Sequence, residues 1–272
     1  MKRSRLVVVA VLAIVFPSLS QAADAKPARP GNDIIGGEPA TLGEFPFMAA
    51  ILDDSIKGDD YQKQFCGGSL IAAQWVLTAA HCVEDARSRL AVAVGRRLLN
   101  SVEGERRAVD LVRIHPSYNS PVGLAHDAAL LHLASPVTGI PVVGLADAAD
   151  DWRELPPTVL TVIGWGTTST RKLSYPNELR KVDVPAVTDG TCRSAYGTSL
   201  HEASMVCAGA PNIDSCYGDS GGPLFDNTDP NAEVQVGIVS WGRGCAKRKF
   251  PGVYSEVNNP SIRSWITTNA GV

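Results

Sequence analysis

Three separate segments of the chain carry side chains suited to nucleophilic catalysis. Ser220 lies in a glycine-rich run from Tyr217 to Pro223, where missing side chains let the backbone approach a reacting group. His81 follows one apolar segment and Asp127 precedes another. A serine hydroxyl is a poor nucleophile until a neighbouring base takes its proton, and that base needs a third group to hold its tautomer. The three residues therefore predict a Ser–His–Asp catalytic group.

Short apolar and β-branched runs, separated by Gly, Pro, Asn and Asp, must position these side chains. Runs of this kind are typical of strands, and many of them predict an all-β sandwich or barrel. A helix is expected only at the end of the chain, where Asn259 can cap and Pro260 suits the first helical position. The clearest strand candidates are residues 90–94, 109–114, 128–133, 158–163, 234–239 and 253–257.

The first residues have the pattern of an export signal. Three cations among the first five residues precede an apolar stretch from Leu6 to Phe16, and small residues at Ser20 and Ala22 suit signal peptidase. A membrane anchor is the alternative, but the stretch is shorter than the roughly 20 apolar residues that span a bilayer. We predict a signal peptide over 1–22, followed by a polar, proline-broken pro-segment over 23–33 and a mature domain over 34–272.

Six cysteines in an exported chain normally form disulfides. They are scattered and contain no Cys-x-x-Cys pair, so we favour disulfides over a zinc site. Their spacing alone leaves the pairing open.

Composition limits the remaining classes of function. The 272 residues are 44% hydrophobic, enough for one large core or two modest ones, and the formal net charge is −3. A chain with this net charge lacks the excess of basic residues that is typical of nucleic-acid-binding proteins.

Taken together, the motifs resemble those of the chymotrypsin/trypsin family of serine peptidases, in the family's His, Asp, Ser order. The resemblance covers nearly everything from Ile34 to Ile266 and rests on independent segments besides the three described above. These are Ile34-Ile35-Gly36-Gly37, Gly164-Trp165-Gly166, Met205-Val206-Cys207-Ala208-Gly209, Ser240-Trp241-Gly242 and Pro251-Gly252-Val253-Tyr254.

The resemblance implies two packed antiparallel six-stranded β-barrels with a C-terminal α-helix and the active site between the barrels. The first barrel is expected over about 34–145, the second over about 155–258 and the helix over about 260–269. The resemblance also implies the disulfides Cys66–Cys82, Cys192–Cys207 and Cys216–Cys245.

It further implies a role for each site residue. Ser220 is expected to attack the scissile carbonyl, His81 to carry the proton and Asp127 to orient His81. The backbone N–H groups of Gly218 and Ser220 are expected to form the oxyanion hole. Asp219 is expected to pair with a new amino terminus at Ile34 after the pro-segment is cut.

Substrate selection is assigned to Asp214, six positions before Ser220. A buried carboxylate favours a lysine or arginine side chain over an apolar one, because an unpaired buried charge is costly. A solvated loop acid is the alternative for this residue. The other expected substrate-binding residues are Ser215, Ser240, Trp241, Gly242 and Gly252.

Three positions depart from the family pattern. Asp33 precedes Ile34 where most precursors have arginine or lysine, so either another protease cuts there or a cut near Arg29 is followed by trimming. Arg96 and Arg106 lie near the places where calcium-loop acids would be expected, although Glu103 and Glu105 remain, and Tyr217 replaces a glutamine at the pocket mouth. We therefore expect no metal and no cofactor.

These inferences predict a secreted trypsin-like endopeptidase, made as a zymogen and cutting after Arg or Lys. Its expected partners are polypeptide substrates, proteinaceous inhibitors and an activating protease, with no nucleic acid and no membrane after signal removal. We expect a monomer, extracellular or, in a bacterium, periplasmic. A catalytically inactive binding protein of the same fold is the main alternative. An α/β-class esterase is a second one that lacks support, because the sequence shows no alternation of strand and helix patterns.

Overall fold

A computed structural model describes residues 35–85, 89–169, 173–229 and 231–272 of the chain. The predicted signal peptide, the predicted pro-segment and Ile34 lie outside the described residues. Within the described part of the chain, no helix has the length and apolar character needed to cross a membrane.

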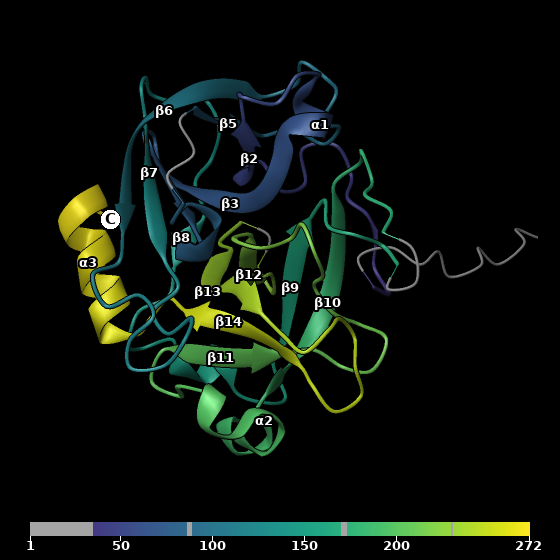
Figure 1. Cartoon of the computed structure of the whole chain (residues 1–272), viewed down its shortest axis with the longest axis vertical. Helices are drawn as coiled ribbons and strands as arrows, with labels where there is room; N and C mark the ends of the chain where they lie inside the picture. Colours follow the sequence, from purple (N-terminus) through teal and green to yellow (C-terminus); the bar gives the residue numbers. More distant parts are fainter. Residues whose placement is uncertain (1–34, 86–88, 170–172, 230) are drawn as a thin grey trace, which may run out of the picture.

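The first half of the chain forms a closed six-stranded barrel (Figure 1). Its strands pair antiparallel in the order β2-β3-β4-β7-β6-β5, closing from β5 back to β2. All residues of β2 and β5 are buried, and all of them except Asp53 at the end of β2 are apolar side chains that fill both faces. The strands are β2 (Met48–Asp53), β3 (Gln64–Ala72), β4 (Trp75–Thr78), β5 (Leu90–Val94), β6 (Glu105–Ile114) and β7 (Ala129–Leu133).

The second half forms another barrel of six antiparallel strands. β9 pairs with both β10 and β12, which closes the path β10-β11-β14-β13-β12. Two short strands extend this sheet: β1 (Glu38–Pro39) pairs with β10, and β8 (Gly144–Leu145) pairs parallel with β13. The six barrel strands are β9 (Val159–Gly164), β10 (Arg180–Val187), β11 (Met205–Ala208), β12 (Pro223–Asp226), β13 (Val234–Trp241) and β14 (Gly252–Glu256).

The two barrels share an apolar contact region. Phe225 of β12 meets Phe45 and Phe47, which precede β2, with both ring centroids 5.4 Å away in edge-on geometry. All three rings are buried. The predicted fold class, two packed six-stranded barrels with a terminal helix, is therefore confirmed.

Helices are short and peripheral. The terminal helix α3 (Pro260–Ala270) begins as expected, with Asn259 Oδ1 accepting hydrogen bonds from the N–H groups of Ser261 and Ile262. The α-helices α1 (Asp60–Lys63) and α2 (Asp189–Tyr196) were not expected from the sequence. The 3-10 turns are η1 (Ala80–Cys82), η2 (Asp151–Glu154) and η3 (Gly197–Ser199).

Three disulfides tie loops to the barrels. They join Cys66 to Cys82, Cys192 to Cys207 and Cys216 to Cys245, the pairing that the resemblance implied. The first bridge connects β3 to the turn that carries His81, and the third connects two walls of the pocket described below.

Candidate active site

His81 and Asp127 are brought together by neighbouring strands of the first barrel. His81 lies in η1 just after β4, Asp127 lies just before β7, and β4 pairs with β7. Asp127 Oδ2 is 2.7 Å from His81 Nδ1, and Oδ1 accepts the His81 backbone N–H at 2.9 Å. Because a carboxylate only accepts hydrogen bonds, Nδ1 must carry the proton. The Nε2 atom of neutral His81 is therefore the one able to accept a proton.

The environment of His81 shifts its basicity. Burial lowers the pKa of the imidazole, but the hydrogen bond and negative charge of Asp127 oppose this effect, and the net result is a pKa above the ordinary value of 6.5. Asp127 is fully buried and also accepts a hydrogen bond from Ser240 Oγ at 2.5 Å. The carboxylate is thus held in one orientation by three donors.

Ser220 sits on a tight turn of the second barrel that packs against the first. The Gly67 N–H of β3 donates to the Ser220 carbonyl at 2.7 Å. Gly221 has a φ of +80°, and a Cβ there would lie 2.2 Å from Thr78 Oγ1. This contact requires glycine, because any side chain would push the turn away from the barrel that carries His81.

The described contacts include no hydrogen bond between Ser220 Oγ and His81; the Nε2 atom of His81 lies 3.8 Å from Cys82 Sγ. Such catalytic hydrogen bonds are often long in a free enzyme and shorten when substrate binds. The structure brings these two predicted residues to the same inter-barrel contact without closing the bond between them.

The backbone N–H groups of Gly218 and Ser220 are free to bind an anion. Neither group donates to an acceptor among the described residues. Gly218 has a φ of +97°, and its carbonyl accepts a hydrogen bond from Gln64 Nε2 at 3.1 Å. Gln64 thus supports the turn from the first barrel, a role that nothing in the sequence pattern indicated.

Asp219 is fully buried beneath this turn. Its Oδ1 accepts the Gly166 N–H at 2.7 Å, and its Oδ2 accepts the Cys216 N–H at 2.9 Å. A Cβ on Gly164 would lie 2.1 Å from Asp219 Oδ1, so glycine is required there. Burial raises the pKa of Asp219 to about 6 although both N–H groups lower it. The expected partner of Asp219, Ile34, lies outside the described residues.

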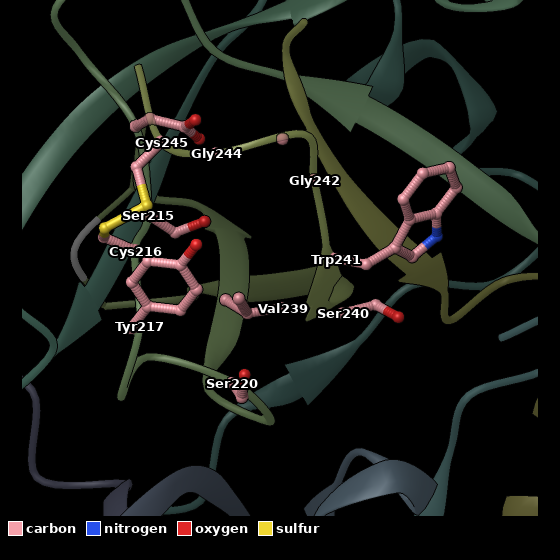
Figure 2. A pocket seen from close by; sticks show the side chains of 12 residues that line it. Ser215, Cys216, Tyr217, Ser220, Val239, Ser240, Trp241, Gly242, Gly244 and Cys245 are labelled. Carbon is pink, nitrogen blue, oxygen red and sulfur yellow. A yellow bond between two sulfur atoms is a disulfide. The ribbon is translucent and has the colours of Figure 1, made fainter. Parts of the chain in front are cut away.

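A cavity of about 240 Å³ opens beside Ser220 (Figure 2). Tyr217 and Trp241 stand on opposite sides of it in this view. The remaining predicted pocket residues also line it, together with the Cys216–Cys245 disulfide. They are Asp214, Ser215, Ser240, Gly242 and Gly252.

Asp214 is the buried charge of this cavity, with an exposed fraction of 2%. Its Oδ2 accepts the Ala246 N–H at 2.8 Å, whereas its Oδ1 has no hydrogen-bond partner among the described residues. A Cβ on Gly252 would lie 2.7 Å from that Oδ1. Burial raises the pKa of Asp214 to about 7, although N–H groups oppose the shift. A cation entering the cavity would supply the missing partner.

Two groups of side chains bear on the expected absence of metal. The side-chain atoms of Cys66, His81 and Cys82 lie close together, but both sulfurs belong to a disulfide and offer no thiolate. Near the first-barrel loop, the guanidinium of Arg96 pairs with Asp60 at 2.7 Å, and Arg106 contacts the same carboxylate at 3.2 Å. Both arginines therefore pair with the Asp60 carboxylate.

Comparison with known proteins agrees with this geometry. The family model described as Trypsin matches residues 34–266. A "Trypsin-like protease" of Streptomyces glaucescens is 37% identical, over 93% of this chain and 86% of its own. A "Trypsin" of Saccharopolyspora erythraea is 39% identical over 82% and 93%, and "Anionic trypsin" of Canis lupus familiaris is 35% identical over 92% and 96%.

Two barrels with a serine turn at their contact define a serine endopeptidase, a hydrolase that acts on polypeptides. The chain belongs to the trypsin family.

Proposed function

We propose that this protein is a secreted trypsin-like endopeptidase, made as a zymogen, that hydrolyses peptide bonds after Arg or Lys through an acyl-enzyme on Ser220. The observation that carries the proposal is the buried carboxylate of Asp214, with one unpartnered oxygen, in a cavity that Ser220 also lines.

The reaction follows from the roles of three side chains. Ser220 Oγ attacks the carbonyl carbon while His81 Nε2 takes the hydroxyl proton. The resulting oxyanion accepts hydrogen bonds from the N–H groups of Gly218 and Ser220. His81 returns the proton to the leaving amine, which departs and leaves the acyl group on Ser220. Water then repeats the sequence and releases the acid. The Asp127 hydrogen bond at 2.7 Å stabilises His81 whenever it is charged.

Selection for basic residues follows from burial. A lysine or arginine side chain in the cavity pairs with the Asp214 carboxylate, whereas an apolar side chain leaves it buried and unpaired. Gly252 keeps the approach to Oδ1 open, since a Cβ there would lie 2.7 Å from that atom. The Ser215 hydroxyl, which lines the same cavity, adds a hydrogen-bonding group.

Activation is assigned to the pairing of Asp219 with an amino terminus at Ile34. Its support is the buried position of Asp219, which holds two N–H donors and no cationic partner among the described residues. Asp33 means that the cut before Ile34 requires a protease other than one specific for basic residues, or trimming after a first cut near Arg29. The basic, apolar and small-residue pattern of residues 1–22 supports secretion.

The test is amino-terminal sequencing of the exported protein together with rates on matched peptides that differ only in Arg, Lys or Phe before the cut. We expect an Ile34 terminus and cleavage after Arg and Lys. Full activity with a terminus upstream of Ile34 would overturn the activation step alone. Equal rates on the Phe peptide would overturn the selection by Asp214, and no cleavage of any peptide would favour an inactive binding protein of this family.

A further inference from the structure

The segment between β13 and β14 carries an unusual concentration of positive charge. Arg243, Lys247, Arg248 and Lys249 fall within seven residues, and all four are exposed. None of them takes part in an ion pair with another described residue. We call these four residues the basic turn. In a chain of net charge −3, its positive charge is open to an external anion.

Packing joins the basic turn into one surface. The Phe250 N–H donates to the Lys247 carbonyl at 3.1 Å, which closes a tight turn around Arg248 and Lys249. The Arg243 guanidinium carbon lies 5.4 Å from the Phe250 ring centroid. A Cβ on Gly244 would lie 3.2 Å from Lys247 Cε, so the lysine side chain lies against Gly244, the residue after Arg243. The four cations therefore lie beside one another rather than around the molecule.

The surface is also hollowed. Lys247, Arg248 and Lys249 line a cavity of about 400 Å³, opposite Thr191 and Ser194 of helix α2. Ammonium, guanidinium and hydroxyl groups are the donors that bind carboxylates. This cavity is separate from the one that contains Asp214, because their lining residues do not overlap.

The basic turn adjoins the wall of the specificity pocket. Gly242, Gly244 and Cys245 follow one another along that wall (Figure 2), and Arg243 lies between the two glycines. A peptide added as a strand along this segment advances about 3.3 Å per residue. Ser240 at the start of the wall contacts Asp127, so the wall leads away from the His81–Asp127 pair toward the basic turn, and a peptide strand that follows the wall reaches that turn.

We propose that the basic turn is a second substrate-binding site, which takes the carboxylates of acidic residues upstream of the cleaved bond. The inference rests on the proposed function, since it concerns the same substrate chain. Each exposed ion pair contributes little, but several together are expected to raise kcat/KM about five- to tenfold, and salt is expected to screen the effect.

The test compares two peptides of equal length, both with Arg before the cut. One carries Asp and Glu at the third to sixth residues upstream, and the other carries Asn and Gln there. We expect the acidic peptide to be cleaved about five- to tenfold faster at low ionic strength, with the ratio approaching one in roughly 0.5 M NaCl. The triple variant K247Q/R248Q/K249Q is expected to lose this ratio and to keep its rate on the neutral peptide.

A matched variant separates local from general charge effects. K57Q/R89Q/R113Q removes the same number of exposed cations from the first barrel and is expected to keep the preference. A third peptide, with its acids downstream of the cut, is expected to behave like the neutral one.

Each other outcome is decisive. Equal cleavage of the acidic and neutral peptides by the unmodified protein overturns the second site and leaves the proposed function standing. Failure to cleave any of these Arg peptides overturns the proposed function and the second site with it. Binding of a sulfated polysaccharide that requires the three cations, without a peptide preference, assigns the basic turn to a different partner and overturns the proposal.

Discussion

In the first barrel, the buried carboxylate of Asp127 accepts three hydrogen bonds, whereas in the second barrel Asp214 keeps one oxygen without a partner among the described residues. Both side chains are at most 2% exposed. The two acids are therefore equally buried, but they differ in how many of their carboxylate oxygens accept hydrogen bonds from the protein.

This difference separates positioning from binding. A carboxylate surrounded by donors is held in place and can orient a neighbouring imidazole. A buried carboxylate with an open oxygen retains part of its desolvation penalty, so it gains free energy when a cation arrives. In the proposed function, the first barrel thus contributes the catalytic pair of His81 and Asp127, and the second contributes a carboxylate that pairs with the substrate cation.

The largest expected effect comes from removing the proposed nucleophile. Ser220→Ala is expected to lower kcat on an Arg peptide by at least about 10⁴-fold, because no covalent intermediate can form. Circular dichroism and thermal unfolding should match those of the unmodified protein, since neither barrel depends on the hydroxyl. Retained turnover would remove Ser220 from the mechanism.

The second effect concerns Asp214, the buried carboxylate with one oxygen that lacks a described hydrogen-bond partner. Asp214→Ser is expected to reduce kcat/KM on Arg and Lys peptides by about 10²- to 10³-fold, because the buried partner of the cation is lost. Rates on a matched Phe peptide should stay level or rise. Unchanged selectivity across the three peptides would show that Asp214 does not select the residue before the cut.

The third effect is the response of catalysis to pH. Since the pKa of His81 lies above 6.5 and only neutral His81 can take the Ser220 proton, kcat should rise about tenfold per pH unit below that pKa and then level off. Measurement at saturating Arg peptide keeps Asp214 paired throughout. A flat profile between about pH 5 and 8 would contradict the role of His81.

The binding of a cation that does not react measures the ionisation of Asp214 separately from that of His81. Burial raises the pKa of Asp214 to about 7, so the carboxylate is charged above that pH and protonated below it. The Kd of a small aromatic amidine is therefore expected to increase about tenfold per pH unit below about 7. Calorimetry on Asp214→Asn is the control, and it should lose this dependence.

The smallest effect tests Asp127, the buried carboxylate with three hydrogen-bond donors. Ser240→Ala removes one of the three donors to Asp127 and is expected to lower kcat about fivefold. With one donor gone, less of the carboxylate's negative charge is offset by hydrogen bonding, so Asp127 should stabilise charged His81 more strongly. The pKa of His81 should then rise, and the pH profile should move to higher pH. An unchanged profile would mean that the 2.5 Å hydrogen bond does not tune the pair.

Much of the barrel architecture was predictable from local patterns. The run at 90–94 was expected as a strand and is β5, and the terminal helix begins at Pro260 after its Asn259 cap. Helix α2 was missed because only two of its residues, Cys192 and Tyr196, are buried, which leaves a weak apolar pattern. Thr188, whose side chain accepts the Thr191 N–H, was its one local signal.

Motif spacing in the sequence by itself determined the family, the expected triad and the pocket acid, because each depends on residue types at fixed distances along the chain. Only the tertiary structure decided which groups donate hydrogen bonds to the buried carboxylates and to the serine turn. The Ser240 donor to Asp127 is 113 residues away in sequence, and Gln64 reaches Gly218 from the other barrel. Contacts between barrels arise from packing of distant segments, and local propensity carries no information about which donors that packing will bring to a buried charge.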